Sequence, residues 1–152
     1  MATTRRATAT WNGDLLSGSG TVTAATTGTF RDQPTTWAAR IGETEGVISP
    51  EELLAAAHAS CFSMAFSNIL AKAGTPPVRV DVEVAISADK LEAGFTVLTA
   101  DIVVRGRAPG ATQESFAAAA DQAKDGCPIS RALAGNVAMT VQATLEGEGD
   151  TT

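Results

Sequence analysis

The chemistry open to this chain depends first on its two cysteines and its one histidine, the candidate nucleophiles and the candidate base. Cys61 stands in the stretch HASCFSMAF, and a cysteine in such apolar company is most often a small buried hydrophobe. A reactive thiol needs a cation, a helix N-terminus or hydrogen-bond donors that stabilise its thiolate. His58 precedes Cys61 by one helical turn and is either a base or a satisfied core histidine. The local pattern therefore leaves an inert thiol and a nucleophile both open.

Cys127 is the more suggestive of the two thiols. It stands before Pro128, which favours the first position of a helix, so Cys127 is expected at the N-cap, where N–H groups favour a thiolate. One thiol on a helix and a second at a helix start suit a thiol–disulfide couple, although two unrelated thiols fit the same residues. Because two cysteines and one histidine make at most an incomplete zinc site, no metal is expected.

Two charged residues have no evident structural task. Glu51 lies in the first turn of a predicted helix beside Glu52, which serves the helix cap, and Arg40 lies in TWAARIGE among apolar and small residues. An arginine in this setting is either a surface charge or a buried ion-pair partner. A pair between Arg40 and Glu51 would hold a cation in a fixed place by the helix.

Alternation of apolar and polar residues predicts the strands that must position these groups. The valines and isoleucine of 78–86 alternate without a fault, and the phase change near Thr99–Ala100 predicts a bulge in the partner strand. Asn12-Gly13-Asp14 predicts a turn between the first two strands. The predicted strands are 7–11, 18–26, Thr36–Ile41, 78–86, 95–104 and 137–145.

Capping residues predict the helices. Ser49, Pro50 and Glu52 form a capping box for a helix that should run to about Lys72 and end at Gly74. A second helix is predicted over roughly 112–125, and Pro128 opens a short third one. The order βββ–α–ββ–α–β predicts an α+β fold, with helices packed on antiparallel sheet.

Length and composition limit the remaining possibilities. The 152 residues predict one domain over 1–146, followed by a polar tail over 147–152. A net charge of −6 argues against nucleic acid and anionic membranes as partners. No apolar segment follows the two arginines near the start, so no secretory signal is expected, and a cytoplasmic location is the default for such a chain.

The central helix is apolar on every side, and its stretch 53–71 is long enough to raise the question of a membrane span. His58 and several serines in the helix, together with the amphipathic strands around it, argue instead for a helix buried in a soluble protein. A domain of this size has too little material to cover every face of such a helix. A second copy of the chain would supply the cover, so we expect a homodimer.

Four stretches of this chain resemble the OsmC/Ohr peroxidases, the family of osmotically inducible protein C and organic hydroperoxide resistance protein. They are TWNGDLLSGSGTV (10–22), SPEELLAAAHASCFSMAFS (49–67), DKLEAGF (89–95) and AKDGCPIS (123–130), and together they cover nearly the whole chain. The details AAHASCFSMA and CPIS are more similar to the OsmC branch. The resemblance implies an OsmC-like fold in an intertwined homodimer.

By this resemblance, Cys61 is similar to the peroxidatic cysteine of the family and Cys127 to the resolving one. Arg40 and Glu51 fall on the family's arginine and glutamate that surround the reactive sulfur. The implied activity is reduction of organic hydroperoxides through a Cys61 sulfenic acid and a Cys61–Cys127 disulfide, with no cofactor. The implied reductant is an external dithiol, either a lipoylated protein or a small dithiol.

Three apolar residues next to Cys61 are candidates for a pocket that favours alkyl or lipid hydroperoxides, namely Phe62, Met64 and Phe66. Two other functions stay open. A cysteine hydrolase or acyltransferase would use His58 as the base of a nucleophilic Cys61, and a non-enzymatic dimeric stress or binding protein would hold two inert thiols.

One further expectation concerns Glu51 and Cys61, which are ten residues apart on the predicted helix. At about 1.5 Å per residue they stand about 15 Å apart along the axis, and at roughly 100° per residue they point about 80° apart around it. Because 53–60 contains no Gly or Pro to bend the helix, we expect Glu51, with Arg40, to reach the Cys61 of a partner subunit.

Overall fold

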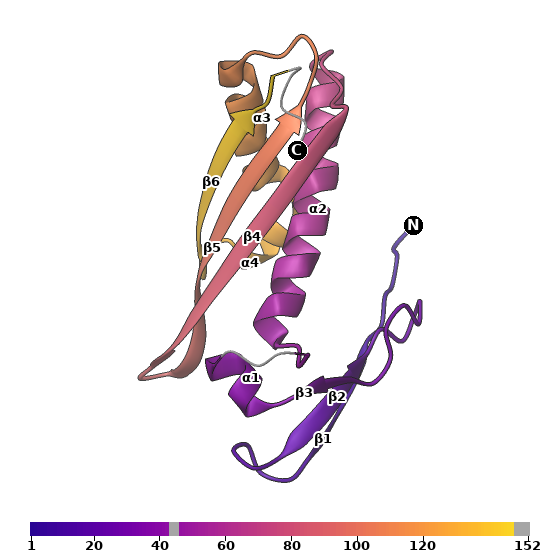
Figure 1. The fold of residues 1–152 in the computed structure, drawn as a ribbon, viewed down its shortest axis with the longest axis vertical. Helices are drawn as coiled ribbons and strands as arrows, with labels where there is room; N and C mark the ends of the chain where they lie inside the picture. The colour runs from indigo at the N-terminus through magenta and orange to yellow at the C-terminus, as the bar shows by residue number, and fades with distance from the viewer. Residues whose placement is uncertain (43–45, 148–152) are drawn as a thin grey trace. The chain divides into compact units, whose positions relative to one another are not determined.

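A computed structural model of the chain describes residues 1–42 and 46–147 (Figure 1). It divides into two compact units, Met1–Leu53 and Leu54–Thr152, which are described in turn. The expectation of one domain over 1–146 stays a prediction, and the predicted tail lies, from residue 148 onward, outside the described residues.

The first unit is built on a small antiparallel sheet. Strands β1 (Thr8–Asn12), β2 (Ser19–Thr23) and β3 (Gln33–Thr35) pair in the order β1-β2-β3. The predicted turn between the first two strands is present, and it needs Gly13 because the backbone there has a φ of +88°. The hairpin predicted at the start of the chain is therefore confirmed.

The strand predicted over Thr36–Ile41 is wrong. The third strand ends at Thr35, and a short helix follows, α1 (Trp37–Ile41). The Thr36 side chain accepts a hydrogen bond from the Ala39 N–H at 3.2 Å, which caps the helix and satisfies one of its first donors. Ala38 and Ala39 favour the helical backbone, so Arg40 lies in the last turn of a helix and not on a strand.

Helix α2 (Pro50–Lys72) is confirmed at both ends, and most of it belongs to the second unit. At its start the Glu52 N–H donates to Ser49 Oγ at 3.1 Å, as a helix cap requires. It ends just before Gly74, whose φ of +83° suits glycine. The helix is uninterrupted between Pro50 and Lys72.

The sheet of the second unit has the order β4-β5-β6, formed by β4 (Arg79–Leu91), β5 (Gly94–Arg107) and β6 (Ala138–Leu145). Strands β4 and β5 form a long antiparallel hairpin. Ser87 pairs with Thr99 and Ala88 with Val97, so Leu98 is the extra residue of a bulge, one position before the predicted place.

The pairing of the last strand differs from the predicted antiparallel sheet, since β6 runs parallel to β5. Helices α3 (Gln113–Gly126) and α4 (Pro128–Leu133) stand between these two strands in the chain. They carry the chain back toward the end of the sheet where β5 begins, as a connection between parallel strands requires. Both helices were expected, and Thr112 and Ser115 form a capping box at the start of α3.

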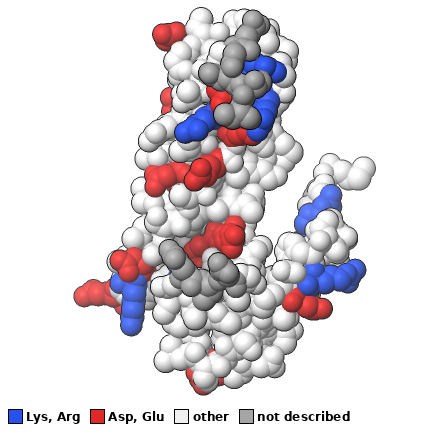
Figure 2. Space-filling model, viewed as in Figure 1, with Lys and Arg blue, Asp and Glu red and all other residues white. Residues whose placement is uncertain are grey.

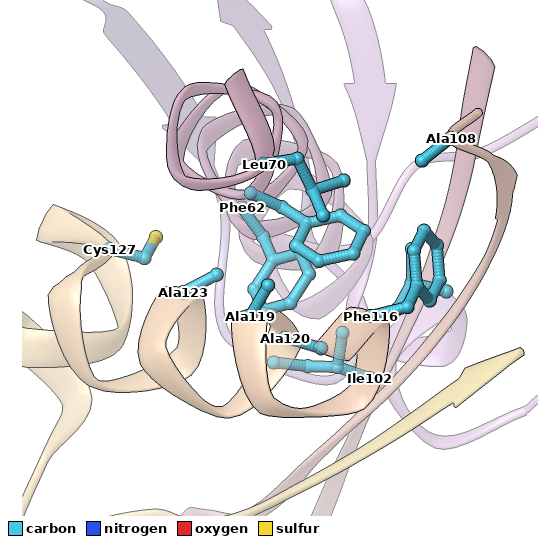
Figure 3. Close-up of a cluster of buried hydrophobic side chains, with 11 residues drawn as sticks. Phe62, Leu70, Ile102, Ala108, Phe116, Ala119, Ala120, Ala123 and Cys127 are labelled. Carbon is cyan, nitrogen blue, oxygen red and sulfur yellow. The ribbon is translucent and has the colours of Figure 1, made fainter. Parts of the chain in front are cut away.

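The core of the second unit lies between helices α2 and α3 and the sheet (Figure 3). Helix α2 contributes a stripe at every fourth residue, and its rings continue to Phe116 of α3, whose ring centre lies 4.8 Å from that of Phe66 in an edge contact. Small alanines on α3 let the helix approach the sheet closely, nearest to β6. The stripe on α2 is His58, Phe62, Phe66 and Leu70.

One chain covers only part of α2, because Met64 on another face is 65% exposed. Among the described residues, α2 is the one helix long and apolar enough by composition to cross a membrane. The core helix of a soluble protein has the same composition, and the buried stripe of α2 packs on a sheet here. The structure is therefore consistent with a soluble protein.

Charged side chains on the face shown in Figure 2 form small groups of either sign, separated by wide uncharged surface. The expectation that nucleic acid and membranes are not partners stays a prediction.

Candidate active site

The two cysteines are brought together in the second unit. Cys61 lies in the middle of α2, and Cys127 lies at the junction of α3 and α4, where it caps α4 with Pro128 in its first turn. Both are free thiols. Each thiol shifts the pKa of the other, so two sulfurs far apart in the sequence are neighbours in the fold. This is the contact that a thiol–disulfide couple requires.

The two thiols differ in access to solvent. Cys127 is completely buried, at the end of the apolar cluster that includes Phe62 and Ala123 (Figure 3). Cys61 is half-buried and packs on the edge of the same cluster. A reagent from solution can therefore reach Cys61 but not Cys127.

The two thiols also differ in acidity. Burial raises the pKa of Cys61, as does its neighbour Cys127, while the Ile129 N–H lowers it by less. Burial opposes ionisation of Cys127 too, but donors from Ser130, Cys61 and Ile129 outweigh it and bring the pKa of Cys127 below its ordinary value. In the second unit the buried thiol is thus the more acidic one.

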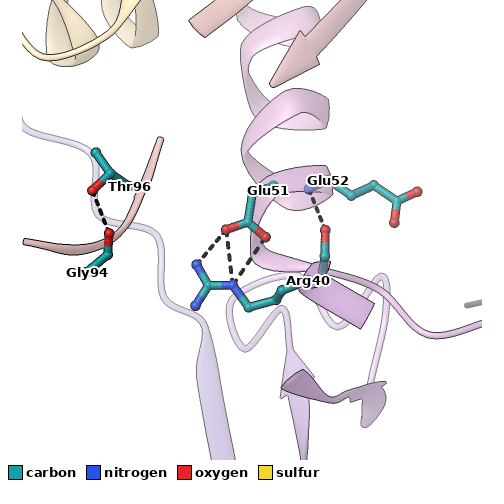
Figure 4. Close-up of polar contacts among 6 residues, drawn as sticks. Arg40, Glu51, Glu52, Gly94 and Thr96 are labelled. Atoms are coloured by element: carbon teal, nitrogen blue, oxygen red, sulfur yellow. Dashed lines mark hydrogen bonds and ion pairs between the residues drawn. The ribbon is translucent and has the colours of Figure 1, made fainter. Parts of the chain in front are cut away.

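Arg40 and Glu51 form the predicted ion pair in the first unit (Figure 4). Arg40 Nη2 lies 2.5 Å from Glu51 Oε1, and Arg40 Nε lies 3.1 Å and 3.3 Å from the two carboxylate oxygens. The guanidinium also lies 5.6 Å from the centre of the Trp37 ring. With side chains 29% and 12% exposed, the pair fixes a cation and leaves part of it open to a ligand.

A pocket of about 300 Å³ lies beside this cation in the first unit. Two aromatic rings and two aliphatic side chains form its apolar walls, and Arg40 contributes the charge. Sequence reasoning missed these walls, although both tryptophans of the chain fall in the first forty residues and that signal was available. The lining residues are Trp11, Leu15, Thr35, Thr36, Trp37, Arg40 and Pro50.

The residues predicted to contact substrate near Cys61 fall in two different places. The rings of Phe62 and Phe66 have no exposed surface and pack in the core, 5.9 Å apart between centres. Met64 is largely exposed and lines a surface hollow with Ser67 and Val80. Core packing accounts for both phenylalanines in this chain, and the substrate contact of these three residues stays a prediction.

His58 and Ser130 form a buried polar contact next to the thiols. His58 Nε2 lies 2.8 Å from Ser130 Oγ, and both residues are essentially inaccessible. Burial lowers the pKa of His58, so its ring is neutral at pH 7. Sequence reasoning weighed His58 as a base for Cys61 or as a satisfied core histidine, and it missed Ser130, which stands 72 residues away.

Among the residues that the structure describes, no three His, Cys, Asp or Glu side chains gather as metal ligands would. The expectation of a metal-free and cofactor-free site stays a prediction.

The sequence profile of the family described as "OsmC-like protein" matches residues 42–142, which is most of the chain. Over 142 residues the chain is 35% identical to "Peroxiredoxin OsmC" of Escherichia coli, covering 93% of this chain and 98% of the relative. The chain belongs to the OsmC/Ohr family. The near-complete match to an OsmC protein agrees with the branch expected from the central-helix and CPIS motifs.

Other members of the OsmC/Ohr family match less closely. "Organic hydroperoxide resistance protein-like 2" of Staphylococcus epidermidis is 32% identical over 100 residues, covering 64% of this chain and 68% of the relative. The crystal structure of the organic hydroperoxide resistance protein OhrB of Bacillus subtilis matches with a TM-score of 0.68 and 27% identity, covering 91% and 97% of the two chains. The expected α+β, OsmC-like fold is thereby confirmed.

The fold likeness extends to more distant members of the OsmC/Ohr family. An organic hydroperoxide resistance protein from Elizabethkingia anophelis superimposes with a TM-score of 0.73 at 22% identity, over 96% of this chain and all of the other. The names of the relatives support, at the level of the family, a peroxide-related function and an enzyme of the peroxidase type. These names do not identify the residues of this chain that would carry out such a reaction.

Proposed function

We propose that this protein is a cysteine-based peroxidase that reduces organic hydroperoxides to alcohols. The observation that carries the proposal is the contact between two free thiols of which one is half-buried and the other completely buried. This difference in access supports Cys61 as the thiol that reacts with peroxide and Cys127 as the thiol that then reacts with Cys61.

In the proposed reaction the Cys61 thiolate attacks the distal oxygen of the hydroperoxide, the O–O bond breaks, and the alkoxide leaves as the alcohol. Cys61 becomes a sulfenic acid, and Cys127 condenses with it to form the Cys61–Cys127 disulfide. A dithiol from outside, either a lipoylated protein or a small dithiol, then reduces the disulfide by exchange. Such a cycle suits a cytoplasmic location, where thiols are kept reduced.

The Arg40–Glu51 pair would meet the need of Cys61 for a cation, since none of the described groups that act on this thiol in the second unit is positively charged. The groups that act on Cys61 in the second unit raise its pKa on balance, so a thiolate at neutral pH needs positive charge from elsewhere. Arg40 would supply this charge and bind the peroxide oxygens, and Glu51 would orient the guanidinium through the contacts in Figure 4. The apolar pocket beside Arg40 would hold an alkyl chain.

The proposed assembly is a homodimer in which each site combines residues of two chains. Glu51 and Cys61 are ten residues apart on the uninterrupted helix α2, so about 15 Å of axis separates them. Mixing Cys61→Ser chains with Glu51→Ala chains tests this arrangement, because a mixed dimer would contain one site with both residues intact. Random pairing should restore about a quarter of wild-type sites. No recovery in proven mixed dimers would place each site within one chain.

The direct test of the activity is thiol titration before and after one equivalent of cumene hydroperoxide. We expect both thiols to disappear together and one equivalent of cumyl alcohol to form, with recovery of both thiols on addition of dihydrolipoamide. Unchanged thiols would favour the non-enzymatic binding protein. Turnover of a thioester or ester with both thiols retained would favour the hydrolase or acyltransferase.

A further inference from the structure

The buried contact between His58 and Ser130 has no part in the proposed peroxide reaction. Both side chains lie at or below 1% exposure, and their polar atoms are 2.8 Å apart. Burying polar atoms in an apolar core costs free energy, which the hydrogen bond between the two side chains offsets. Its position next to the thiols suggests chemistry.

The hydrogen of the His58 ring can be assigned from what surrounds its two nitrogens. Nδ1 is buried without a hydrogen-bond partner among the described residues. The neutral ring carries one hydrogen, and a buried N–H without an acceptor is rarer in proteins than an acceptor without a donor. We therefore assign the hydrogen to Nε2, which donates it to Ser130 Oγ.

This assignment fixes the direction of the Ser130 hydroxyl. An oxygen that accepts from His58 directs its own hydrogen elsewhere, and the Cys127 sulfur is the acceptor next to it. Ser130 stands three residues after Cys127, at the third position of the helix whose N-cap position Cys127 occupies, and its N–H and hydroxyl both lower the pKa of Cys127. The result is a donor chain from His58 through Ser130 to Cys127.

The remaining surroundings of Cys127 leave this chain with little competition. Cys127 belongs to an apolar cluster to which helices α2 and α3 contribute Phe62, Ala119 and Ala123 and β5 contributes Ile102. Within the described part of the chain, the groups that act on the sulfur are Cys61, Ser130 and the Ile129 N–H. The titratable members of this neighbourhood are Cys61 and, through Ser130, His58.

We propose that His58 and Ser130 are positioning residues for Cys127, with His58 orienting the Ser130 hydroxyl so that it donates to the Cys127 thiolate that closes the disulfide. The role in disulfide closure rests on the proposed peroxidase function. The donor chain itself exists whether or not Cys61 reacts with peroxide.

The donor chain serves the step that closes the disulfide. Cys127 loses its proton, and its thiolate attacks the sulfur of the Cys61 sulfenic acid. The S–S bond forms, the S–O bond breaks, and the hydroxide that leaves takes up the proton as water. Ser130 keeps its hydrogen throughout. The same donors stabilise Cys127 as the leaving thiolate when an external thiolate attacks Cys61.

The test uses the Cys61→Ser protein, in which Cys127 is the remaining thiol, and follows the ultraviolet absorbance of its thiolate with pH. Ser130→Ala should raise the pKa of Cys127, and so should His58→Phe, which keeps a ring but removes the donor. His58→Gln places an N–H near the position of Nε2 and should restore most of the wild-type value. Ser63→Ala, on the exposed face of α2, is the matched control and should change nothing.

Two features separate this donor chain from a merely structural contact. Adding His58→Phe to Ser130→Ala should raise the pKa of Cys127 no further, because the chain is already broken. In the protein with Cys61 intact, Ser130→Ala should slow disulfide closure after one equivalent of cumene hydroperoxide by about tenfold, with formation of the sulfenic acid unchanged. Ser130→Ala removes one hydroxyl and leaves a space of only that size, so this variant remains informative even if His58→Phe does not fold.

An unchanged pKa of Cys127 in Ser130→Ala would overturn the proposal, and so would additive effects of the two substitutions. The titration involves no peroxide, so its result can be interpreted even if the proposed peroxidase function is wrong. A normal titration with no reaction towards hydroperoxide would contradict the peroxidase function alone.

Discussion

The surroundings of Cys61 and Cys127 shift the pKa values of the two thiols in opposite directions. Cys127 is completely buried, yet donors from α4 and from Cys61 lower its pKa. Cys61 is half-buried in the middle of α2, and burial and its neighbour Cys127 raise its pKa. The thiol that peroxide can reach is therefore the less acidic of the two.

The two thiols therefore need different groups to stabilise their thiolates. Cys127 receives its stabilising donors from residues next to it in the sequence and from one buried serine–histidine contact. A residue in the middle of a helix has no free N–H of its own helix beside it, and the Ile129 N–H does not outweigh burial, so Cys61 depends on a side chain from elsewhere. The Arg40–Glu51 pair of the first unit is the candidate, because it is a cation already fixed in direction.

The largest effect is expected from Cys61→Ser. A serine hydroxyl is not ionised near neutral pH and does not form a sulfenic acid, so peroxide consumption should fall by more than about a thousandfold, which corresponds to about 4 kcal/mol in the barrier. Peroxide loss in a single turnover is the measurement. Activity that survives in this variant would transfer the peroxidatic role to Cys127 and break the comparison.

The second largest effect is expected from Cys127→Ser. Cys61 should still react once with peroxide, but its sulfenic acid should accumulate and oxidise further under excess peroxide, because the resolving thiol is absent. Mass spectrometry of the protein after increasing amounts of cumene hydroperoxide distinguishes these species. Full turnover with a dithiol in this variant would show that Cys127 does not resolve the sulfenic acid.

A smaller effect is expected from Arg40→Ala. Loss of the proposed cation should raise the pKa of Cys61 and slow its reaction with peroxide by about tenfold or more at neutral pH, with less effect at alkaline pH. Arg40→Lys should recover part of the rate, since lysine keeps the charge but lacks the planar fork that Glu51 binds. The pH profile of the single-turnover rate is the measurement, and Arg31→Ala is a control arginine in the same unit. Equal profiles for wild type, Arg40→Ala and Arg40→Lys would leave Arg40 as a structural charge.

The smallest effect is expected on stability, through His58. Because burial lowers the pKa of His58 in the fold, the unfolded chain takes up a proton below about pH 6.5 while the folded chain does not. The free energy of unfolding should therefore fall as pH drops below that value, by at most about 1.4 kcal/mol per pH unit from this group. Above about pH 6.5 His58 should contribute no pH dependence to the free energy of unfolding, because the ring is neutral in both states.

Urea unfolding of wild type and His58→Gln between pH 7.5 and pH 5 checks this sign, with the pH values set around the ordinary pKa of histidine at roughly 6.5. Other groups titrate alike in the two proteins and cancel in the difference. A His58→Gln variant that loses stability as steeply as wild type would mean that His58 is charged in the fold, and would weaken its assigned role toward Ser130.

Elements whose signals are local could be predicted from the order of the residues. Alternating valines specified β4, and Ser49, Pro50 and Gly74 set the ends of α2, because capping and alternation act over a few neighbouring residues. Both cysteines and the Arg40–Glu51 pair were also identifiable, since their types and motifs stand in the sequence. The one local failure, over Thr36–Ile41, arose because a five-residue helix is too short to show a helical period.

Features that depend on burial and on distant contacts could not be predicted from the residue order and became visible in the fold. The parallel pairing of β6, the partnership of His58 with Ser130, and the core position of Phe62 and Phe66 all join residues far apart in the chain. The order of acidity of the two thiols was likewise decided there. A thiol's pKa is set by the donors and the dielectric that the fold places around it, and a list of neighbours in sequence contains neither.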